Sequence, residues 1–132
     1  MPRPNRALVL IALVLLAGCL RDESATGYAG GLWQLRQLSG QPLSHPITLD
    51  LRERGQVSGM GPCNRYRASL DVPYPWFGLG SIQRTRAACP ELLQEEAYLA
   101  LLQRMSFAEV SGPVLILSNE AGERLDFHRA QP

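Results

Sequence analysis

The 132-residue chain has no lysine, only two histidines and only three cysteines, which removes the usual residues of several functional classes. All thirteen basic residues are arginine, a bias that we attribute to genomic base composition. Twelve acidic residues nearly balance them, leaving a formal net charge of +1. A chain so close to neutral argues against a nucleic-acid binder and against a general polyanion binder.

Metal-binding and catalytic patterns are also missing from the sequence. There is no Cys-x-x-Cys pair, and His45 and His128 have no ligand spacing with a cysteine, so we expect no metal and no cofactor. No carboxylate pair stands out as a glycosidase would need, and no nucleophile has an evident histidine base. The glycines near Gly61 lack the ending of a phosphate-binding loop. We therefore expect a protein that is not an enzyme.

The first nineteen residues have the features of a bacterial lipoprotein signal. Arg3 and Arg6 precede an apolar run over residues 7–16, which is too short to span a bilayer comfortably. The run ends in Leu-Ala-Gly-Cys at residues 16–19, which resembles the lipobox, whose cysteine is acylated and begins the mature protein. An ordinary cleaved signal, or an uncleaved anchor with a chance cysteine, is the alternative.

Residues 1–18 are accordingly expected to be a signal peptide, and residues 19–30 the lipidated Cys19 with a flexible tether. Two or three acyl chains hold a protein far more firmly than one, so the membrane is the first expected partner. Leu20 follows the cysteine, where an aspartate would favour inner-membrane retention in enteric bacteria. The expected location is the bacterial cell envelope, on the outer membrane facing the periplasm, as a monomer.

Two cysteines remain after Cys19 is assigned to lipidation. In an oxidising compartment, two such cysteines in a small domain commonly form a disulfide. Joining Cys63 to Cys89 would close a loop of 26 residues (89 − 63) and stabilise the fold by roughly 3 kcal/mol. A reactive thiol pair and a metal site are the competing interpretations.

Alternating apolar and polar residues predict several short strands and one helix. The helix is expected to begin at Pro90. Its apolar face is expected to consist of Leu93, Ala97, Leu101 and Met105, flanked by Tyr98 and Leu102. The strands are expected at residues 32–38, 47–52, 56–59, 65–72, 76–82, 107–110, 114–118 and 124–128.

Seven or eight short strands with one helix predict a mainly β domain over residues 31–130. Strands this short and numerous favour an antiparallel sheet curled into a β-barrel-like structure or half-barrel, with the helix over an opening. The sequence shows neither an internal repeat nor a second domain.

The segments around the inner cysteines resemble a known family. Cys-Asn-Arg-Tyr at residues 63–66 and Thr-Arg-Ala-Ala-Cys at residues 85–89 are the most specific motifs. An opening Gly-Leu-Trp at residues 31–33 and a Glu-x-x-Tyr-Leu helix at residues 95–99 lie in the expected order. On these motifs the chain resembles the META domain family, which includes the HslJ-like bacterial lipoproteins.

The resemblance implies a small barrel-like domain, commonly exported and lipid-anchored, without an established reaction and loosely linked with stress response and secretion. Two roles fit. One is a binding or assembly module, in which an envelope or secretion protein or a lipid-like ligand occupies the helix-covered mouth of the barrel. The fold also resembles lipoproteins that pilot secretins. The other is a stress-tolerance factor of the envelope.

Four arginines surround the two cysteine motifs: Arg65, Arg67, Arg84 and Arg86. If they converge in space, they form a binding site for an anion or a partner, because guanidinium groups bind anions through charge-assisted hydrogen bonds. The alternative is that they are solvated side chains on the outer faces of strands, where alternating charge is ordinary.

Overall fold

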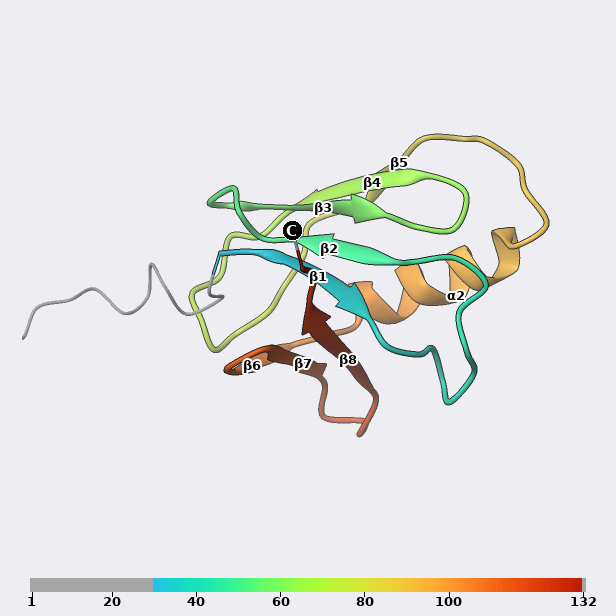
Figure 1. Ribbon diagram of the computed structural model, residues 1–132. Helices are drawn as coiled ribbons and strands as arrows, with labels where there is room; N and C mark the ends of the chain where they lie inside the picture. The colour runs from blue at the N-terminus through green and yellow to red at the C-terminus, as the bar shows by residue number, and fades with distance from the viewer. Residues whose placement is uncertain (1–29, 132) are drawn as a thin grey trace, which may run out of the picture.

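The computed structural model describes residues 30–131, which form one antiparallel sheet and a single helix (Figure 1). Cys19 and the expected signal peptide lie outside the described residues, as does most of the expected tether. The strands are β1 (Leu32–Leu35), β2 (Thr48–Asp50), β3 (Gln56–Met60), β4 (Arg65–Ser69), β5 (Gln83–Arg84), β6 (Phe107–Ser111), β7 (Val114–Ser118) and β8 (Arg124–Arg129), and the helix is α2 (Leu92–Gln103).

The eight strands of the described chain follow the order β5-β4-β3-β2-β1-β8-β7-β6. The two halves of the sheet join where β1 pairs with β8, with Trp33 opposite Arg129 and Leu35 opposite Phe127. The prediction of a mainly β fold with a curled antiparallel sheet and one helix is confirmed. The sheet is open, since β5 and β6 form its two edges.

The segment over residues 76–82 is not a strand, contrary to the prediction. It carries two isolated bridges instead, which join Trp76 to Phe107 on β6 and Leu79 to Leu70 just after β4. Two glycines interrupt this segment, and glycine weakens a continuous strand because it loses more conformational freedom on folding. The segment therefore touches both halves of the sheet without completing a barrel.

The helix begins at Leu92 and not at Pro90, and its buried face is rotated toward Tyr98 and Leu102, with Leu101 still buried. Leu93 is 80% exposed and Ala97 is exposed as well, so these two positions were wrongly assigned to the apolar stripe. Glu95, Tyr98 and Leu102 are fully buried. The prediction failed because the helix turns a carboxylate inward, which a count of apolar residues cannot anticipate.

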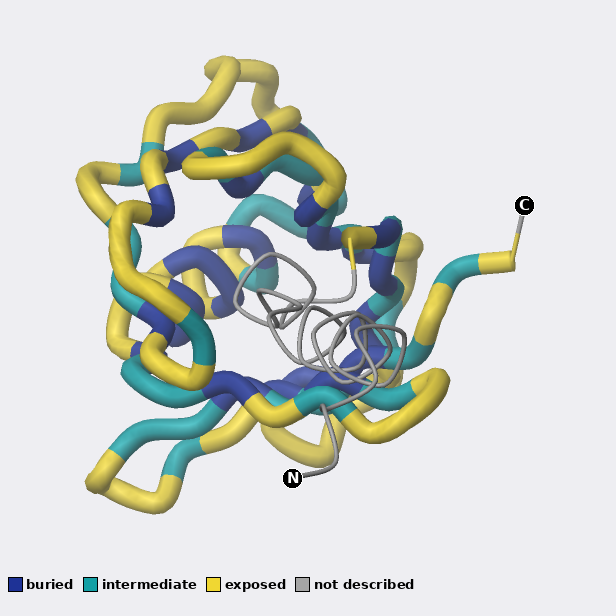
Figure 2. Tube along the Cα trace, turned by 90° about the vertical axis from the view of Figure 1, so that its left-hand side faces the viewer, coloured by how far each residue is buried: buried dark blue, intermediate teal, exposed yellow. Residues whose placement is uncertain are grey.

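The core lies on the inner side of the curled sheet and against the helix (Figure 2). Buried and more exposed positions alternate along β1, β4, β7 and β8, as in the half-buried sheets of small β domains. The largest fully buried apolar side chains are Trp33, Leu35, Ile47, Leu49, Val57, Tyr98, Leu102, Leu115, Leu117, Leu125 and Phe127. No helix within residues 30–131 is long and apolar enough to cross a membrane.

Candidate functional site

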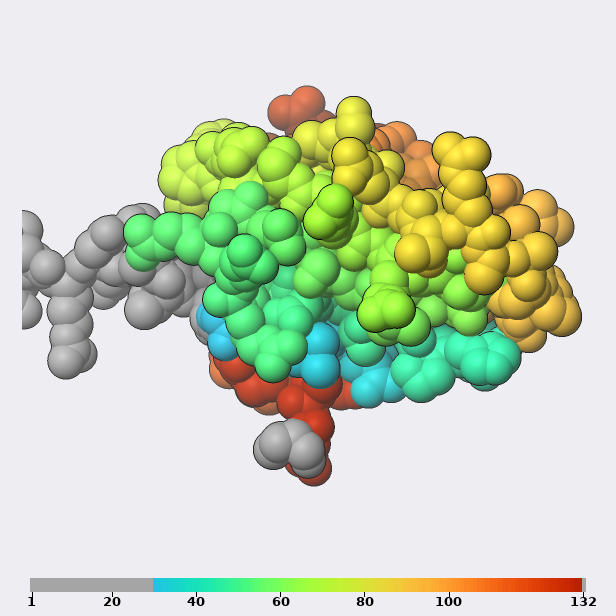
Figure 3. All heavy atoms as spheres, turned by 90° about the horizontal axis from the view of Figure 1, so that it is seen from above, coloured from blue at the N-terminus to red at the C-terminus, as the bar shows by residue number. Residues whose placement is uncertain are grey.

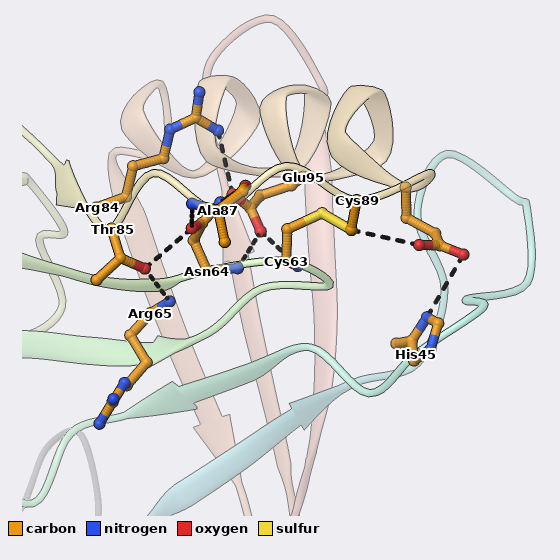
Figure 4. Close-up of a disulfide and its surroundings, with 10 residues drawn as sticks. His45, Cys63, Asn64, Arg65, Arg84, Thr85, Ala87, Cys89 and Glu95 are labelled. Atoms are coloured by element: carbon orange, nitrogen blue, oxygen red, sulfur yellow. Dashed lines mark hydrogen bonds and ion pairs between the residues drawn. A yellow bond between two sulfur atoms is a disulfide. The ribbon is translucent and has the colours of Figure 1, made fainter.

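The two cysteine motifs meet beside the first turns of α2 (Figure 4). A disulfide joins Cys63 and Cys89, whose Cα atoms are 5.7 Å apart, so the predicted pairing is confirmed. It ties the loop after β3 to the chain just before the helix. Both cysteines are half-buried, and the bridge leaves neither thiol free for catalysis or for a metal.

Glu95 on α2 is the centre of this region. Its carboxylate is fully buried, and its Oε2 atom accepts hydrogen bonds from the backbone N–H groups of Cys63 and Asn64, both at 2.7 Å. Its Oε1 atom accepts from Asn64 Nδ2 at 2.7 Å and from Arg84 Nη1 at 3.1 Å. Four donors from three residues, two in the loop after β3 and one on β5, thus converge on one carboxylate.

Asn64 connects the same loop to the segment that leads into the helix. Its side chain is buried, and Oδ1 accepts hydrogen bonds from the Ala87 N–H at 2.6 Å and from Thr85 Oγ1 at 3.0 Å. Its Nδ2 also donates to the Ala87 carbonyl at 3.0 Å. Every polar atom of this side chain is used inside the fold, which fixes the position of the loop.

The charge of Glu95 follows from these contacts. Burial alone would raise the pKa of its carboxyl group, but the hydrogen bonds from Asn64, from the Cys63 backbone and from Arg84 outweigh burial and lower the pKa below the ordinary value of 4.5. Glu95 is therefore an anion at neutral pH. A catalytic acid needs the opposite shift, so the geometry favours a structural role for this carboxylate.

Two buried tyrosines extend the polar network into the core. Tyr66 donates its hydroxyl proton to the Thr48 carbonyl at 2.6 Å, and its oxygen lies 2.7 Å from that of Tyr98. Because a carbonyl can only accept, the Tyr66 proton is already engaged and Tyr98 must be the donor between the two hydroxyls. Burial raises the pKa of both phenols, so both stay neutral.

Gly59 and Gly61 lie where the backbone passes close to these groups. A Cβ atom on Gly61 would lie 2.6 Å from Glu95 Oε2, and one on Gly59 would lie 2.7 Å from the Tyr66 hydroxyl. At Gly61 the backbone approaches the buried acid, and at Gly59 it approaches the Thr48 carbonyl and the buried phenol.

The four arginines of the predicted binding site are divided between two neighbouring hollows that share Arg84: Arg65 and Arg67 line one, and Arg86 lines the other. Arg84 reaches across to the helix, where its guanidinium group pairs with Glu95 at 3.1 Å and with Glu96 at 3.3 Å. Arg86 is exposed beside a hollow of about 650 Å³ that Arg84 also lines. Arg65 and Arg67 both lie on the outer face of β4. Sequence reasoning named Glu95 only as part of a family motif and did not identify it as the partner of Arg84.

Arg65 and Arg67 border a shallow groove of about 700 Å³ on the outer face of β2–β5. Figure 3 views the molecule from above, that is, from the side on which β3, β4 and β5 lie uppermost in Figure 1. The groove is lined by Leu32, Thr48, Asp50, Gln56, Ser58, Gly59, Met60, Arg65, Tyr66, Arg67, Gln83, Arg84 and Thr85.

Within residues 30–131 no group of three or more His, Cys, Asp or Glu side chains could hold a metal ion.

Comparison with known proteins agrees with the motifs that meet at the disulfide. A META domain profile matches residues 26–132. The chain belongs to the META domain family. In this META domain the two most specific motifs, residues 63–66 and 85–89, are held together by the disulfide and by Asn64 and Glu95.

Solved structures share the fold of this META domain. An NMR structure of a protein from Burkholderia xenovorans has a TM-score of 0.62 and 27% identity, covering 83% of this chain and 89% of that one. The crystal structure of a DUF4847 family protein from Bacteroides vulgatus has a TM-score of 0.63 and 12% identity, covering 80% of this chain and 96% of that one. At such low identity the second match shows the fold alone. Among curated protein sequences, nothing matches the chain.

Proposed function

We propose that this META domain protein is a lipid-anchored protein of the bacterial envelope that binds a partner and catalyses no reaction. One observation carries the proposal. The motif residues with catalytic potential, Asn64, Glu95 and the two inner cysteines, are all engaged inside the fold by hydrogen bonds or by the disulfide. The exposed polar side chains instead surround an open groove, which suits binding and offers no nucleophile with an adjacent base.

The anchor and the location rest on the sequence before residue 20. The Leu-Ala-Gly-Cys motif at residues 16–19 supports acylation of Cys19, and Leu20 supports sorting to the outer membrane, with the domain facing the periplasm. Leu32, the first residue of β1, follows Cys19 by thirteen positions (32 − 19). A chain of that length spans at most about 45 Å, so the domain would stay close to the membrane.

The binding site is proposed on the outer face of β2–β5. The helix-covered interior was the earlier expectation, but Trp33, Tyr98 and Phe127 are each fully buried there and pack with the helix and sheet. Closely packed interiors leave few voids larger than a water molecule. The outer groove is open to solvent and carries both polar and apolar side chains, which is typical of surfaces that bind ligands or partners.

The anchor is tested by expressing the full chain with its own signal and measuring the mass of the membrane-bound product. We expect cleavage before Cys19 and a mass increase corresponding to diacylation or triacylation, and a Cys19→Ala variant should lose both. An unmodified chain recovered from the cytosol would contradict the proposed anchor.

The binding face is tested by photo-crosslinking in intact cells. A photoreactive residue at Gln83, which lines the groove, should give a reproducible cross-linked product. The same residue at Glu120, exposed in the turn between β7 and β8, is the matched control and should give none. Capture of one secretion component would favour a pilot-type role. Equal products from both positions, or none from either, would reject the groove as the binding face.

A further inference from the structure

The outward side chains of β3, β4 and β5 form two rows across the groove. Strand pairing places Met60 and Ser58 opposite Arg65 and Arg67, and Gln83 also pairs with Arg67. Thr85 extends the first row, because its N–H donates to the Arg65 carbonyl at 3.0 Å. Residues two apart on a strand lie about 7 Å apart on the same face. Arg65 and Arg67 are therefore neighbours on the same face of β4, and both line the groove.

These two arginines carry charge that the described chain does not neutralise. Within residues 30–131, no carboxylate lies within ion-pair distance of Arg65 or Arg67. Arg67 donates from Nε to Gln83 Oε1 over 3.4 Å, a long hydrogen bond to a neutral group. Two positive charges thus face the groove side by side.

The other charged groups of the groove already have partners. Asp50 is the one carboxylate among its lining residues, and Arg52 engages it through Nε at 2.9 Å and Nη2 at 2.6 Å. Arg84 is neutralised by Glu95 and Glu96. The hollow next to Arg86 is less suited to an anion. Arg84, which lines both this hollow and the groove, is already paired with Glu95 and Glu96.

The groove also has apolar surface next to its positive charge. Met60 is 46% exposed on β3, and Leu32 lines the groove at the start of β1. A ligand that joins an anionic group to an apolar body would satisfy both features. Guanidinium groups bind phosphate through paired, charge-assisted hydrogen bonds, so phosphate is the favoured anionic group.

We propose that the outer groove of β2–β5 binds the phosphate headgroup of an anionic phospholipid, with Arg65 and Arg67 as its ligands. A lipid is favoured over an acidic protein segment because of where the groove begins. Leu32 lines the groove and lies only thirteen residues after Cys19, the proposed site of membrane attachment. This step rests on the proposed function, since acylation of Cys19 would hold the groove near a membrane at high effective concentration.

The test uses the full chain purified in a non-ionic detergent and titrated at fixed salt concentration with short-chain dihexanoyl phosphatidylglycerol. Backbone amide NMR shifts of residues 56–69 and 83–85 should change and saturate. Dihexanoyl phosphatidylcholine should leave them unchanged, and inorganic phosphate should bind at least about tenfold more weakly because it lacks the apolar body.

Paired variants keep the test specific. A variant with both Arg65→Gln and Arg67→Gln should bind phosphatidylglycerol at least about tenfold more weakly, since each arginine near an anionic lipid contributes to attraction. The matched control, Arg36→Gln with Arg54→Gln, removes the same charge from exposed positions outside the groove and should change affinity less than twofold. All four positions are exposed, so unfolding midpoints should confirm that both variants fold.

Several results would overturn the proposal. Phosphatidylcholine binding as tightly as phosphatidylglycerol would show that the anionic headgroup is not recognised. An equal loss of phosphatidylglycerol affinity in both double variants would show only non-specific attraction between the lipid and arginine charge. Inorganic phosphate binding as tightly as the lipid would make the site one for free anions. Polyglutamate saturating the same amides when phosphatidylglycerol does not would indicate an acidic protein partner. The titration does not depend on acylation of Cys19. The lipid site can therefore fail its test while the mass measurement supports the anchor, and the anchor can fail while the titration supports the lipid site.

Discussion

Asn64 is bonded to the carboxylate of Glu95 through two separate groups. Its backbone N–H donates to Oε2 and its side-chain Nδ2 donates to Oε1, both at 2.7 Å. The same asparagine holds Ala87 through both the N–H and the carbonyl of that residue. One buried pair therefore fixes the loop after β3, the chain before α2 and the helix itself.

Replacing Glu95 by glutamine should destabilise the domain strongly. The amide would present its NH₂ group to donors that now face a carboxylate oxygen, leaving buried N–H groups without an acceptor. We expect a loss of about 3 kcal/mol in the free energy of unfolding, as for other buried charged partners. Urea unfolding of the oxidised variant at neutral pH measures the loss directly.

Glu96→Gln is the matched control for that substitution. Glu96 also pairs with Arg84, at 3.3 Å, but its side chain is 49% exposed. Exposed ion pairs contribute little because solvent screens them, so we expect a change of about 0.5 kcal/mol or less. Equal losses in the two variants would show that Arg84 pairing, and not the buried hydrogen bonds, stabilises the loop.

The stability contributed by Glu95 should depend on pH. The folded state lowers the pKa of Glu95 below its ordinary value of 4.5, so its contribution is complete above that pH and declines as the pH falls below it. The difference in unfolding free energy between the wild type and Glu95→Gln should therefore shrink below about pH 4.5. Chemical unfolding curves between pH 7 and pH 3 measure this difference.

Glu123 must be separated from that measurement. Hydrogen bonds from Arg104 and Asn119 lower its pKa to about 2, so its own contribution is lost over an overlapping acid range. Repeating the curves in a Glu123→Gln background removes that contribution, because the bonds of Glu123 are to Arg104 and Asn119 and not to the Asn64–Glu95 pair. A difference that stays constant down to pH 3 in that background would contradict the assigned charge of Glu95.

Gly61→Ala should destabilise the loop without any change of charge. The added methyl group would lie 2.6 Å from Glu95 Oε2, and the buried acid cannot retreat without breaking its hydrogen bonds. We expect a cost of about 1–3 kcal/mol, typical of overpacking in a filled interior. Gly30→Ala is the control, because a Cβ atom there meets no atom of residues 30–131 within 4 Å. Thermal unfolding of both variants compares the two sites.

The strand pattern and the disulfide were predictable because they depend on local alternation and on cysteine number. Arg65 and Arg67 lie two residues apart on β4, so alternation was enough to place them on one face. The strand β5 was not anticipated at residues 83–84, because both of its residues are exposed and it pairs with β4 alone. The preceding segment was expected to be the strand, since its apolar residues suggested one.

The burial of Glu95 and its pairing with Arg84 were missed for one shared reason. Glu95 is charged, so a pattern of apolar residues assigns it to solvent, and Arg84 then has no evident partner. Its burial depends on donors from residues 63, 64 and 84, which only the folded chain brings together. Two signals were available: the Glu-x-x-Tyr-Leu motif at residues 95–99, and the spacing of three and seven residues that places Glu95 on the same face as Tyr98 and Leu102.

Loss of the disulfide should cost about 3 kcal/mol, as expected for a closed loop of this length. The sequence separation between Cys63 and Cys89 is 26 residues, and opening the loop gives the unfolded chain more freedom. The variant with both Cys63→Ser and Cys89→Ser should show this loss in urea unfolding. A reducing agent should shift the wild-type curve toward that of the variant and leave the variant unchanged. A wild-type curve indifferent to reduction would contradict a stabilising bridge.

The two buried tyrosines should respond unequally to loss of their hydroxyl groups. Tyr98→Phe removes one donor but leaves Tyr66 bonded to the Thr48 carbonyl, so we expect a loss of about 1 kcal/mol. Tyr66→Phe leaves both the Tyr98 hydroxyl and the Thr48 carbonyl without this partner, so we expect about 2–3 kcal/mol. Urea unfolding of the two single variants and the double variant measures the asymmetry and the coupling. A larger loss in Tyr98→Phe would reverse the assigned direction of the hydrogen bond between the tyrosines.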